Sequence, residues 1–158
     1  MTVTAKDVMD TTFLTLHPKM SVTEVVKVFK KASEEQKSKS FGLLVTTDQG
    51  ELVGMVSMFD VLLLMRPKHI HIWGEMNDMD VTGFLDETCR RAKSILVEDI
   101  MTTDLISITP DTHLLFIVDI MIRKHLRRLP VLENGKVVGI VYISKVFYHL
   151  MERPSCMT

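Results

Sequence analysis

The sequence predicts an α+β protein built from two similar halves, each with the order strand, helix, strand, strand, helix. The first observation behind this prediction is a repeat at the start of each half. Asp7–Met9 recurs as Asp99–Met101, and Phe13–Pro18 recurs as Leu105–Pro110, both at an offset of 92 residues. A constant offset over these residues indicates a duplicated unit. The repeat therefore predicts two similar halves independently of any single helix or strand.

The second observation is a repeat around a glycine-containing turn. Gly50–Val56 recurs as Gly135–Val141 at an offset of 85 residues, so the first half carries seven additional residues. We expect them within the polar stretch Ser33–Ser40, because a helix end or a loop tolerates added length.

Each half opens with a short strand, predicted at Phe13–Leu16 and at Leu105–Ile108, and a proline follows soon after each. Proline has no N–H to donate, so it suits the point where the chain leaves an extended segment for a helix.

A helix is predicted next in each half. In the first half, Ser21 and Glu24 have the spacing of a capping box. Four apolar residues then fall on one helical face: Val22, Val25, Val26 and Phe29. In the second half, Leu114–Ile122 is apolar nearly all round, which is typical of a helix covered on more than one side.

A strand pair and a closing helix complete each half. The predicted strands are Phe41–Thr46 with Leu52–Ser57, and Arg128–Leu132 with Val137–Ile143. Asn134-Gly135 between the second pair is a strong hairpin signal, because both residues accept positive φ. The closing helices are predicted at Phe59–Met65 and at Ser144–Met151.

A repeat of about 60 residues is too small to be comfortably stable alone, so we expect the two to pack as a pseudo-twofold pair over a shared sheet face. The predicted boundaries are residues 1–66 for the first repeat, 67–93 for a linker or insertion, and 94–155 for the second repeat. The middle segment holds the only tryptophan, Trp73, and a helix predicted at Val81–Ala92.

Composition limits the partners. Lys and Arg number 19 against 20 for Asp and Glu, so no whole-protein field attracts nucleic acid or anionic lipid, and we expect neither partner. The longest apolar stretches fall far short of the roughly 20 residues of a membrane span. Cys89 and Cys156 lack metal-binding spacing, and no signal peptide is visible, so we expect a cytoplasmic protein with reduced thiols.

The repeated motifs resemble those of the CBS (cystathionine β-synthase) domain family, as a tandem pair or Bateman module. They are an initial Asp-hydrophobic-Met, a strand before Thr-Pro or a near variant, Arg128–Val131 as R-x-P-V, and Gly54–Asp60 as G-h-h-[ST]-x-x-[DN]. The resemblance implies a regulatory module that binds AMP, ADP or ATP, or less often S-adenosylmethionine, in the cleft between the repeats. It also implies a homodimeric disc, with the apolar helix Leu114–Ile122 and the closing helices facing the second copy.

Gly54–Asp60 matches the ribose-binding motif of the family. A carboxylate accepts hydrogen bonds from both vicinal hydroxyls of a ribose, and the start of a helix favours a nearby anion. By resemblance, Thr103 and Asp104 offer backbone groups to the adenine, and Arg127 or Arg128 reaches the phosphates. The implied nucleotide site consists of Met55, Ser57, Phe59, Asp60, Thr103, Asp104, Arg127 and Arg128.

The mirror-image motif of the second repeat departs from this pattern. Tyr142 stands at its Ser/Thr position and Lys145 at its Asp position. A lysine cannot accept a hydrogen bond from a ribose hydroxyl, so we expect one nucleotide per chain and an empty or differently used second cleft.

Simpler interpretations stay open for these residues. Asp60 could be only a helix cap, and Arg127 with Arg128 only a solvated pair. A zinc site is conceivable at His69 and His71 with Asp78 and Asp80 nearby, but a full ligand set is lacking, and we expect no metal.

No activated nucleophile, Walker-type loop or paired carboxylates are recognisable, so we expect no catalysis. The alternative function is a structural or interaction module with vestigial clefts, in which residues 67–93 bind a partner or an effector protein.

Overall fold

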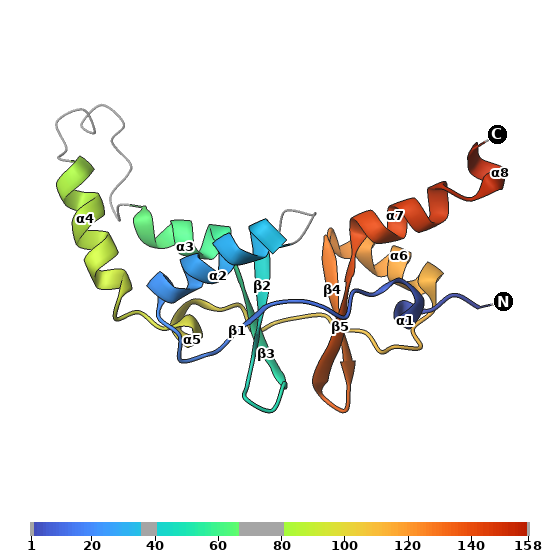
Figure 1. Cartoon of the computed structure of the whole chain (residues 1–158), viewed down its shortest axis with the longest axis horizontal. Coiled ribbons are helices and arrows are strands. Elements are labelled where there is room, and N and C mark those ends of the chain that lie inside the picture. The colour runs from blue at the N-terminus through green and yellow to red at the C-terminus, as the bar shows by residue number, and fades with distance from the viewer. Residues whose placement is uncertain (1, 36–40, 67–80, 158) are drawn as a thin grey trace. The chain divides into compact units, whose positions relative to one another are not determined.

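The computed structural model describes residues 2–35, 41–66 and 81–157, and Figure 1 shows its helices and strands. The mixed helices and strands confirm the predicted α+β class. The chain divides into two compact units. Unit 1 is Met1–Phe13, Asp48–Leu52 and Asp104–Thr158, and unit 2 is Leu14–Thr47 and Val53–Thr103. Each unit therefore combines most of one repeat with the short segment that opens the other.

Unit 2 contains most of the first repeat. Its elements are β1 (Thr15–Leu16), α2 (Val22–Glu35), β2 (Gly42–Thr46), β3 (Leu52–Ser57), α3 (Met58–Met65), α4 (Val81–Ala92) and α5 (Val97–Ile100), although the first residue of β3, Leu52, is grouped with unit 1. The strand order is β1-β2-β3, and β1 runs parallel to β2 with Thr15 opposite Leu44. The core is formed by Leu16, Val25, Phe29, Ala32, Leu43, Val45, Val56 and Val97.

Unit 1 contains most of the second repeat. Its elements are α1 (Ala5–Val8), α6 (Leu114–Lys124), β4 (Arg128–Glu133), β5 (Lys136–Tyr142), α7 (Ile143–Met151) and α8 (Pro154–Met157). The antiparallel β4–β5 hairpin turns at Asn134 and Gly135, whose φ angles of 55° and 79° confirm the predicted turn. The core is formed by Ala5, Val8, Ile108, Leu114, Ile117, Met121, Leu129, Val131, Val141 and Val146.

Two predicted details of the helices and strands differ in the structure. At Leu105–Ile108 only Ile108 joins the sheet, through bonds to Pro130 O (3.0 Å) and from Leu132 N–H (2.8 Å). Pro130 has no N–H to extend this ladder, and the register of β4 shifts at Val131/Leu132. The sequence predicts Val26 on one helical face with Val22, Val25 and Phe29, but Val26 is 53% exposed, because one residue beyond Val25 turns the side chain about 100° around the helix.

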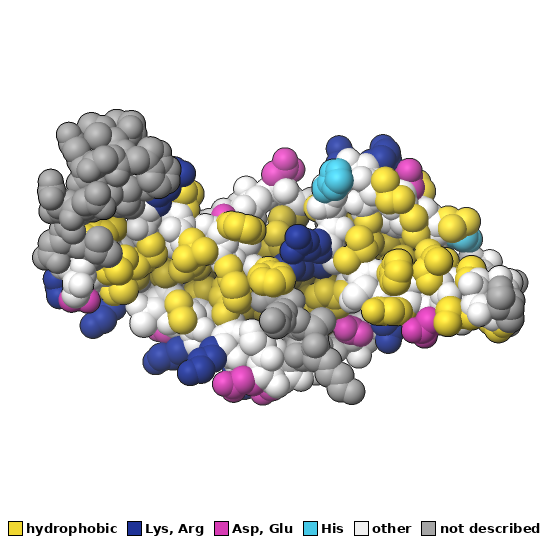
Figure 2. All heavy atoms as spheres, turned by 90° about the horizontal axis from the view of Figure 1, so that it is seen from above, with side chains coloured by type: hydrophobic (Ala, Val, Ile, Leu, Met, Phe, Trp, Pro, Cys, Tyr) yellow, Lys and Arg dark blue, Asp and Glu magenta, His cyan; other side chains and the backbone are white. Residues whose placement is uncertain are grey.

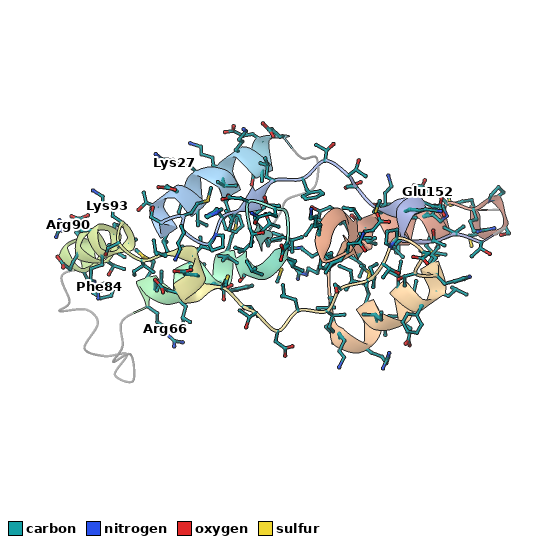
Figure 3. The ribbon with its side chains drawn as sticks, turned by 90° about the horizontal axis from the view of Figure 1, so that it is seen from below. Lys27, Arg66, Phe84, Arg90, Lys93 and Glu152 are labelled. Atoms are coloured by element: carbon teal, nitrogen blue, oxygen red, sulfur yellow. The ribbon has the colours of Figure 1, made fainter. Side chains whose placement is uncertain are left out.

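The helix α2 begins as predicted, since Glu24 N–H donates to Ser21 Oγ at 3.3 Å. The predicted helix in the middle segment forms as α4, which contacts α2 and α3. Its Thr88 is buried and donates to Phe84 O at 2.9 Å. Arg90 and Lys93 remain exposed near the C-terminal end of this helix (Figure 3). The other notable residue of the segment, Trp73, lies outside the described residues.

The helix α6 is less covered within one chain than its composition predicts. Leu114, Ile117 and Met121 are buried, whereas Leu115 and Ile122 are 64% and 68% exposed. Figure 2 shows many hydrophobic side chains exposed over the helices. Large apolar side chains exposed together on one helix are typical of an interaction site.

Candidate functional site

The start of α3 is organised by a reciprocal capping box. The strand β3 runs directly into the helix, with Ser57 as the N-cap and Asp60 three residues on. Ser57 N–H and Oγ–H donate to Asp60 Oδ2 at 2.7 and 3.0 Å, and Asp60 N–H donates to Ser57 Oγ at 3.2 Å. The simpler interpretation of Asp60 as a helix cap is therefore correct as far as it goes.

Capping uses only one oxygen of the Asp60 carboxylate. Both recorded bonds are accepted by Oδ2, and Oδ1 has no partner in the part of the chain that the structure describes. The side chain is only partly buried. A half-occupied carboxylate at a helix N-terminus retains acceptor sites for a hydroxyl-bearing ligand.

The neighbouring backbone comes from the segment that opens the second repeat. Met55 N–H donates to Thr102 O at 2.9 Å, and Thr102 N–H donates to Met55 O at 2.8 Å. Thr103 follows directly in the chain. Met55, Ser57, Phe59, Asp60 and Thr103 thus all belong to unit 2, with Phe59 largely exposed at 79%.

A close packing contact holds this segment in place, and sequence reasoning missed it. A Cβ at Gly54 would lie 2.6 Å from Met101 Sδ and 3.1 Å from Thr102 O. Only glycine lets the backbone approach so closely. Gly54 of the first repeat and Met101 of the second repeat are therefore packing partners within unit 2.

The remaining candidate residues belong to unit 1. Asp104 opens its last segment, Arg128 is the first residue of β4, and Arg127 directly precedes that strand. Arg127 O accepts a bond from Ile143 N–H at 2.9 Å, which ties the residue before β4 to the first residue of α7.

Arg128 is the more unusual of the two cations. Its Cα is opposite that of Tyr142, and its Nε is buried without a hydrogen-bond partner among the described residues. Burial lowers the pKa of Arg128, the adjacent Tyr142 opposes this shift, and Arg127 adds to it. An orphaned guanidinium N–H is costly unless a partner arrives, and an anionic ligand is one such partner.

The start of α7 has the same backbone plan without the same chemistry. Tyr142 is the N-cap and makes no side-chain cap bond, and Lys145 occupies the place of Asp60. The glycine contact is nevertheless repeated, since a Cβ at Gly139 would lie 2.6 Å from Met9 Sδ and 3.1 Å from Asp10 O. The two junctions share their packing and differ in their polar groups.

No cluster of three or more His, Cys, Asp and Glu side chains suited to a metal occurs in residues 2–35, 41–66 and 81–157. His69, His71, Asp78 and Asp80 lie outside the described residues. Over the same described ranges, no helix has the length and apolar character needed to cross a membrane.

Comparison with protein families gives one match that covers both repeats. A family model described as CBS domain matches residues 5–67 and 97–152. The chain is 32% identical over 80 residues to the CBS domain-containing protein CBSCBSPB3 of Arabidopsis thaliana, and 23% identical over 136 residues to an uncharacterized protein, MJ1225, of Methanocaldococcus jannaschii. These matches cover 51% and 86% of this chain, which spans only 14% and 39% of those relatives.

Solved structures of the same architecture include two with nucleotides. The plan of this chain matches CBSX2 in complex with AMP with a TM-score of 0.68 and 24% identity, over 94% of this chain and 96% of that one. It matches the cytosolic domain of the Mg²⁺ channel MgtE in complex with ATP with a TM-score of 0.68 and 21% identity, over 91% of this chain and 47% of that one. At these identities the likeness shows a shared fold.

Proposed function

Because the chain belongs to the CBS domain family, we propose that it is a non-catalytic regulatory module that binds one adenine nucleotide per chain. The single observation that carries this proposal is the Asp60 carboxylate, which caps α3 with Oδ2 and whose Oδ1 has no partner among the residues that the structure describes. The AMP complex of CBSX2 and the ATP complex of the MgtE domain support the ligand class.

In this proposal the two repeats contribute different parts of the site. Asp60 accepts hydrogen bonds from the ribose hydroxyls, and Ser57, Met55, Phe59 and the Thr103–Asp104 backbone surround the sugar and base. Arg127 and Arg128 bind the phosphates, and a phosphate oxygen gives the buried Nε of Arg128 the partner it lacks. The planar guanidinium fork fits a phosphate better than a lone ammonium does.

The cations also bear on the choice of ligand. AMP, ADP and ATP present phosphates to Arg127 and Arg128, whereas S-adenosylmethionine brings a sulfonium cation and no phosphate. We therefore favour the nucleotides. A nucleotide bound by both repeats can change their packing only if it binds one arrangement of the repeats more tightly than another. Regulation would then follow from a change in the populations of the two arrangements.

Calorimetric titration tests the proposal. The native chain is titrated with AMP, ADP, ATP and S-adenosylmethionine, and so is Asp60→Ala. We expect one site per chain for at least one nucleotide and a loss of that binding in Asp60→Ala. Absence of heat with all four ligands contradicts the proposal, and unchanged binding by Asp60→Ala contradicts the position of the site.

Incubation with ATP and Mg²⁺ tests the absence of catalysis. We expect no phosphate release above a protein-free control, because the family motifs supply ligand contacts and no activated nucleophile. Sustained release proportional to protein concentration would make the chain an enzyme.

We further propose that the module is a cytoplasmic homodimer. In unit 1, α6 and α7 expose large apolar side chains: Leu115, Phe116, Ile122, Ile143, Phe147, Tyr148 and Met151. Burying such side chains against a second copy would gain about 25 cal/mol per Å² of apolar surface. Sedimentation equilibrium should give twice the chain mass, and Ile122→Glu should shift it toward the monomer.

The second candidate is an interaction module that needs no nucleotide. The observation that favours it is the exposed apolar surface of α3, where Phe59, Leu62 and Leu63 are 57% to 79% exposed beside α4. In this case residues 67–93 would help to bind an effector protein. The calorimetric titration above separates the two candidates, because only the first requires heat with a nucleotide.

A further inference from the structure

A cleft of about 710 Å³ opens in unit 1, away from the residues assigned to the nucleotide. It is bordered by α1, the Thr109–Asp111 turn and the turn between β4 and β5. This turn is the opposite end of β5 from Tyr142 and the start of α7. The volume lies in the range of about 300–1,000 Å³ that is usual for small-molecule sites.

The lining of the cleft has an apolar part and a charged part, besides the uncharged polar residues Thr109 and Asn134. The apolar side chains are Met9, Pro110, Leu132 and Val138, all partly buried. The charged side chains are Lys6, Asp111 and Glu133, all exposed. A ligand that fits both parts must combine an apolar group with charges of both signs.

The repeat supplies an internal comparison for this cleft, because α1 corresponds to α5 at the offset of 92 residues. The same two backbone bonds tie each short helix to a turn that contains a proline, which follows the helix in unit 1 and precedes it in unit 2. They are Ala5 N–H to Thr112 O (2.9 Å) and Lys6 N–H to Pro110 O (2.9 Å), and Val97 N–H to Met20 O (2.8 Å) and Glu98 N–H to Pro18 O (3.0 Å).

The charges on this common frame are reversed. In unit 2, Lys19 on the turn and Glu98 on the helix form an ion pair at 2.8 Å. In unit 1, Asp111 holds the place of Lys19, and Lys6 holds the place of Glu98. Within the described part of the chain, neither Lys6 nor Asp111 forms an ion pair. The two opposite charges at these positions therefore form an ion pair in unit 2 and form none at the cleft of unit 1.

We propose that this cleft binds a small zwitterion with an apolar side chain, an α-amino acid of the leucine or methionine type. The ligand carboxylate pairs with Lys6, and the ligand ammonium pairs with Asp111 and Glu133. The ligand side chain covers the apolar surface of Met9, Leu132 and Val138. This site is independent of the nucleotide, because none of its residues belongs to the proposed nucleotide site.

Titration of the ¹⁵N-labelled full chain tests the proposal, with L-leucine and L-methionine as probes and amide resonances as the readout. We expect saturable shifts at Lys6, Asp111 and Glu133. Two analogues of leucine each lack one charge: 4-methylpentanoate has no ammonium, and 3-methylbutylamine has no carboxylate. Each should bind at least about tenfold more weakly, the equivalent of one lost charge-assisted contact.

A double variant closes the cleft with the chemistry of unit 2. Lys6→Glu with Asp111→Lys recreates the Lys19–Glu98 pair on the same backbone frame, so we expect a folded chain without the amino-acid shifts. Glu152→Gln, just past α7 and outside the lining, is the matched control and should bind as the native chain does (Figure 3). If the double variant fails to fold, Lys6→Gln and Asp111→Asn singly replace it.

Three results would overturn the assignment. The first is the absence of shifts with both amino acids at their solubility limits. The second is binding of 3-methylbutylamine as tightly as leucine, which would make the cleft an amine site. The third is undiminished binding by the folded double variant or by both single variants.

Discussion

The two strand-to-helix junctions of this chain share their backbone conformation and glycine packing but differ in their polar side chains. At Gly54–Asp60 and at Gly139–Lys145, a methionine sulfur packs against the glycine and a strand continues directly into a helix. Only the first junction has a capping box, yet α7 forms after the second without one. The carboxylate of Asp60 is thus dispensable for this backbone plan, and the glycine-methionine contact is common to both copies.

This difference separates what the fold requires from what a ligand would require. A residue kept in both copies serves the shared packing, as Gly54 and Gly139 do. A residue present at only one copy of an otherwise equal junction needs another reason. For Asp60, the proposed reason is the ribose.

The largest effect should come from giving the first junction the residue of the second. Asp60→Lys replaces an anionic acceptor with a cationic donor. The new side chain carries the same charge as the phosphate-binding arginines and the opposite charge to the phosphates, but it cannot accept a hydrogen bond from a ribose hydroxyl. We expect nucleotide affinity to fall at least about 100-fold, as for the loss of two charge-assisted hydrogen bonds. Calorimetry measures the change. The matched variant Lys145→Asp should leave the affinity within about twofold, and an equal loss in both variants would place the ligand elsewhere.

The next effect should be equal at the two junctions. Gly54→Ala and Gly139→Ala each force a Cβ to within 2.6 Å of a methionine sulfur and 3.1 Å of a backbone oxygen. We expect each to lower the free energy of unfolding by about 2 kcal/mol, as for other overpacked sites. Urea denaturation measures the change. Adding Met101→Ala to Gly54→Ala should recover part of the loss, and no coupling between the two would contradict the contact.

Much of this architecture is legible in the sequence, because turn and cap chemistry are local. Asn134 and Gly135 must both adopt positive φ in a tight hairpin, and Ser21 with Glu24 marks the start of α2 by spacing alone. The capping role of Asp60 is also predicted by its position three residues after Ser57 in the sequence. These signals depend only on residues within four positions of one another.

The rest depends on contacts that spacing does not encode. Met101 packs on Gly54 across 47 positions, and Met9 packs on Gly139 across 130. Neither the pairing of each opening segment with its unit nor the open Lys6 and Asp111 charges can be read from periodicity. Val26 shows the limit within a helix, since adjacent residues lie about 100° apart around the axis and only Val25 of the two valines is buried.

A smaller effect should distinguish the two helix starts. Ser57→Ala removes the Oγ that accepts from Asp60 N–H, and we expect a loss of about 1 kcal/mol in the free energy of unfolding. Ser144→Ala, in the first turn of α7, removes an exposed hydroxyl for which no cap bond is recorded. That control should stay within about 0.5 kcal/mol of the native chain, and equal losses would mean that the capping box contributes nothing specific.

The smallest expected effect is a gain at the second junction. Lys145 places a cation in the first turn of α7, where the partial positive charge of the helix N-terminus disfavours it. An aspartate there replaces the cation with an anion, which the helix N-terminus favours. We expect Lys145→Asp to raise the free energy of unfolding by about 0.5 kcal/mol, and Lys145→Ala by less, since it removes the cation without supplying an anion. Thermal denaturation of both variants measures the difference. A Lys145→Asp chain less stable than the native one would show that the lysine has a stabilising partner, and the second junction would then carry a role of its own.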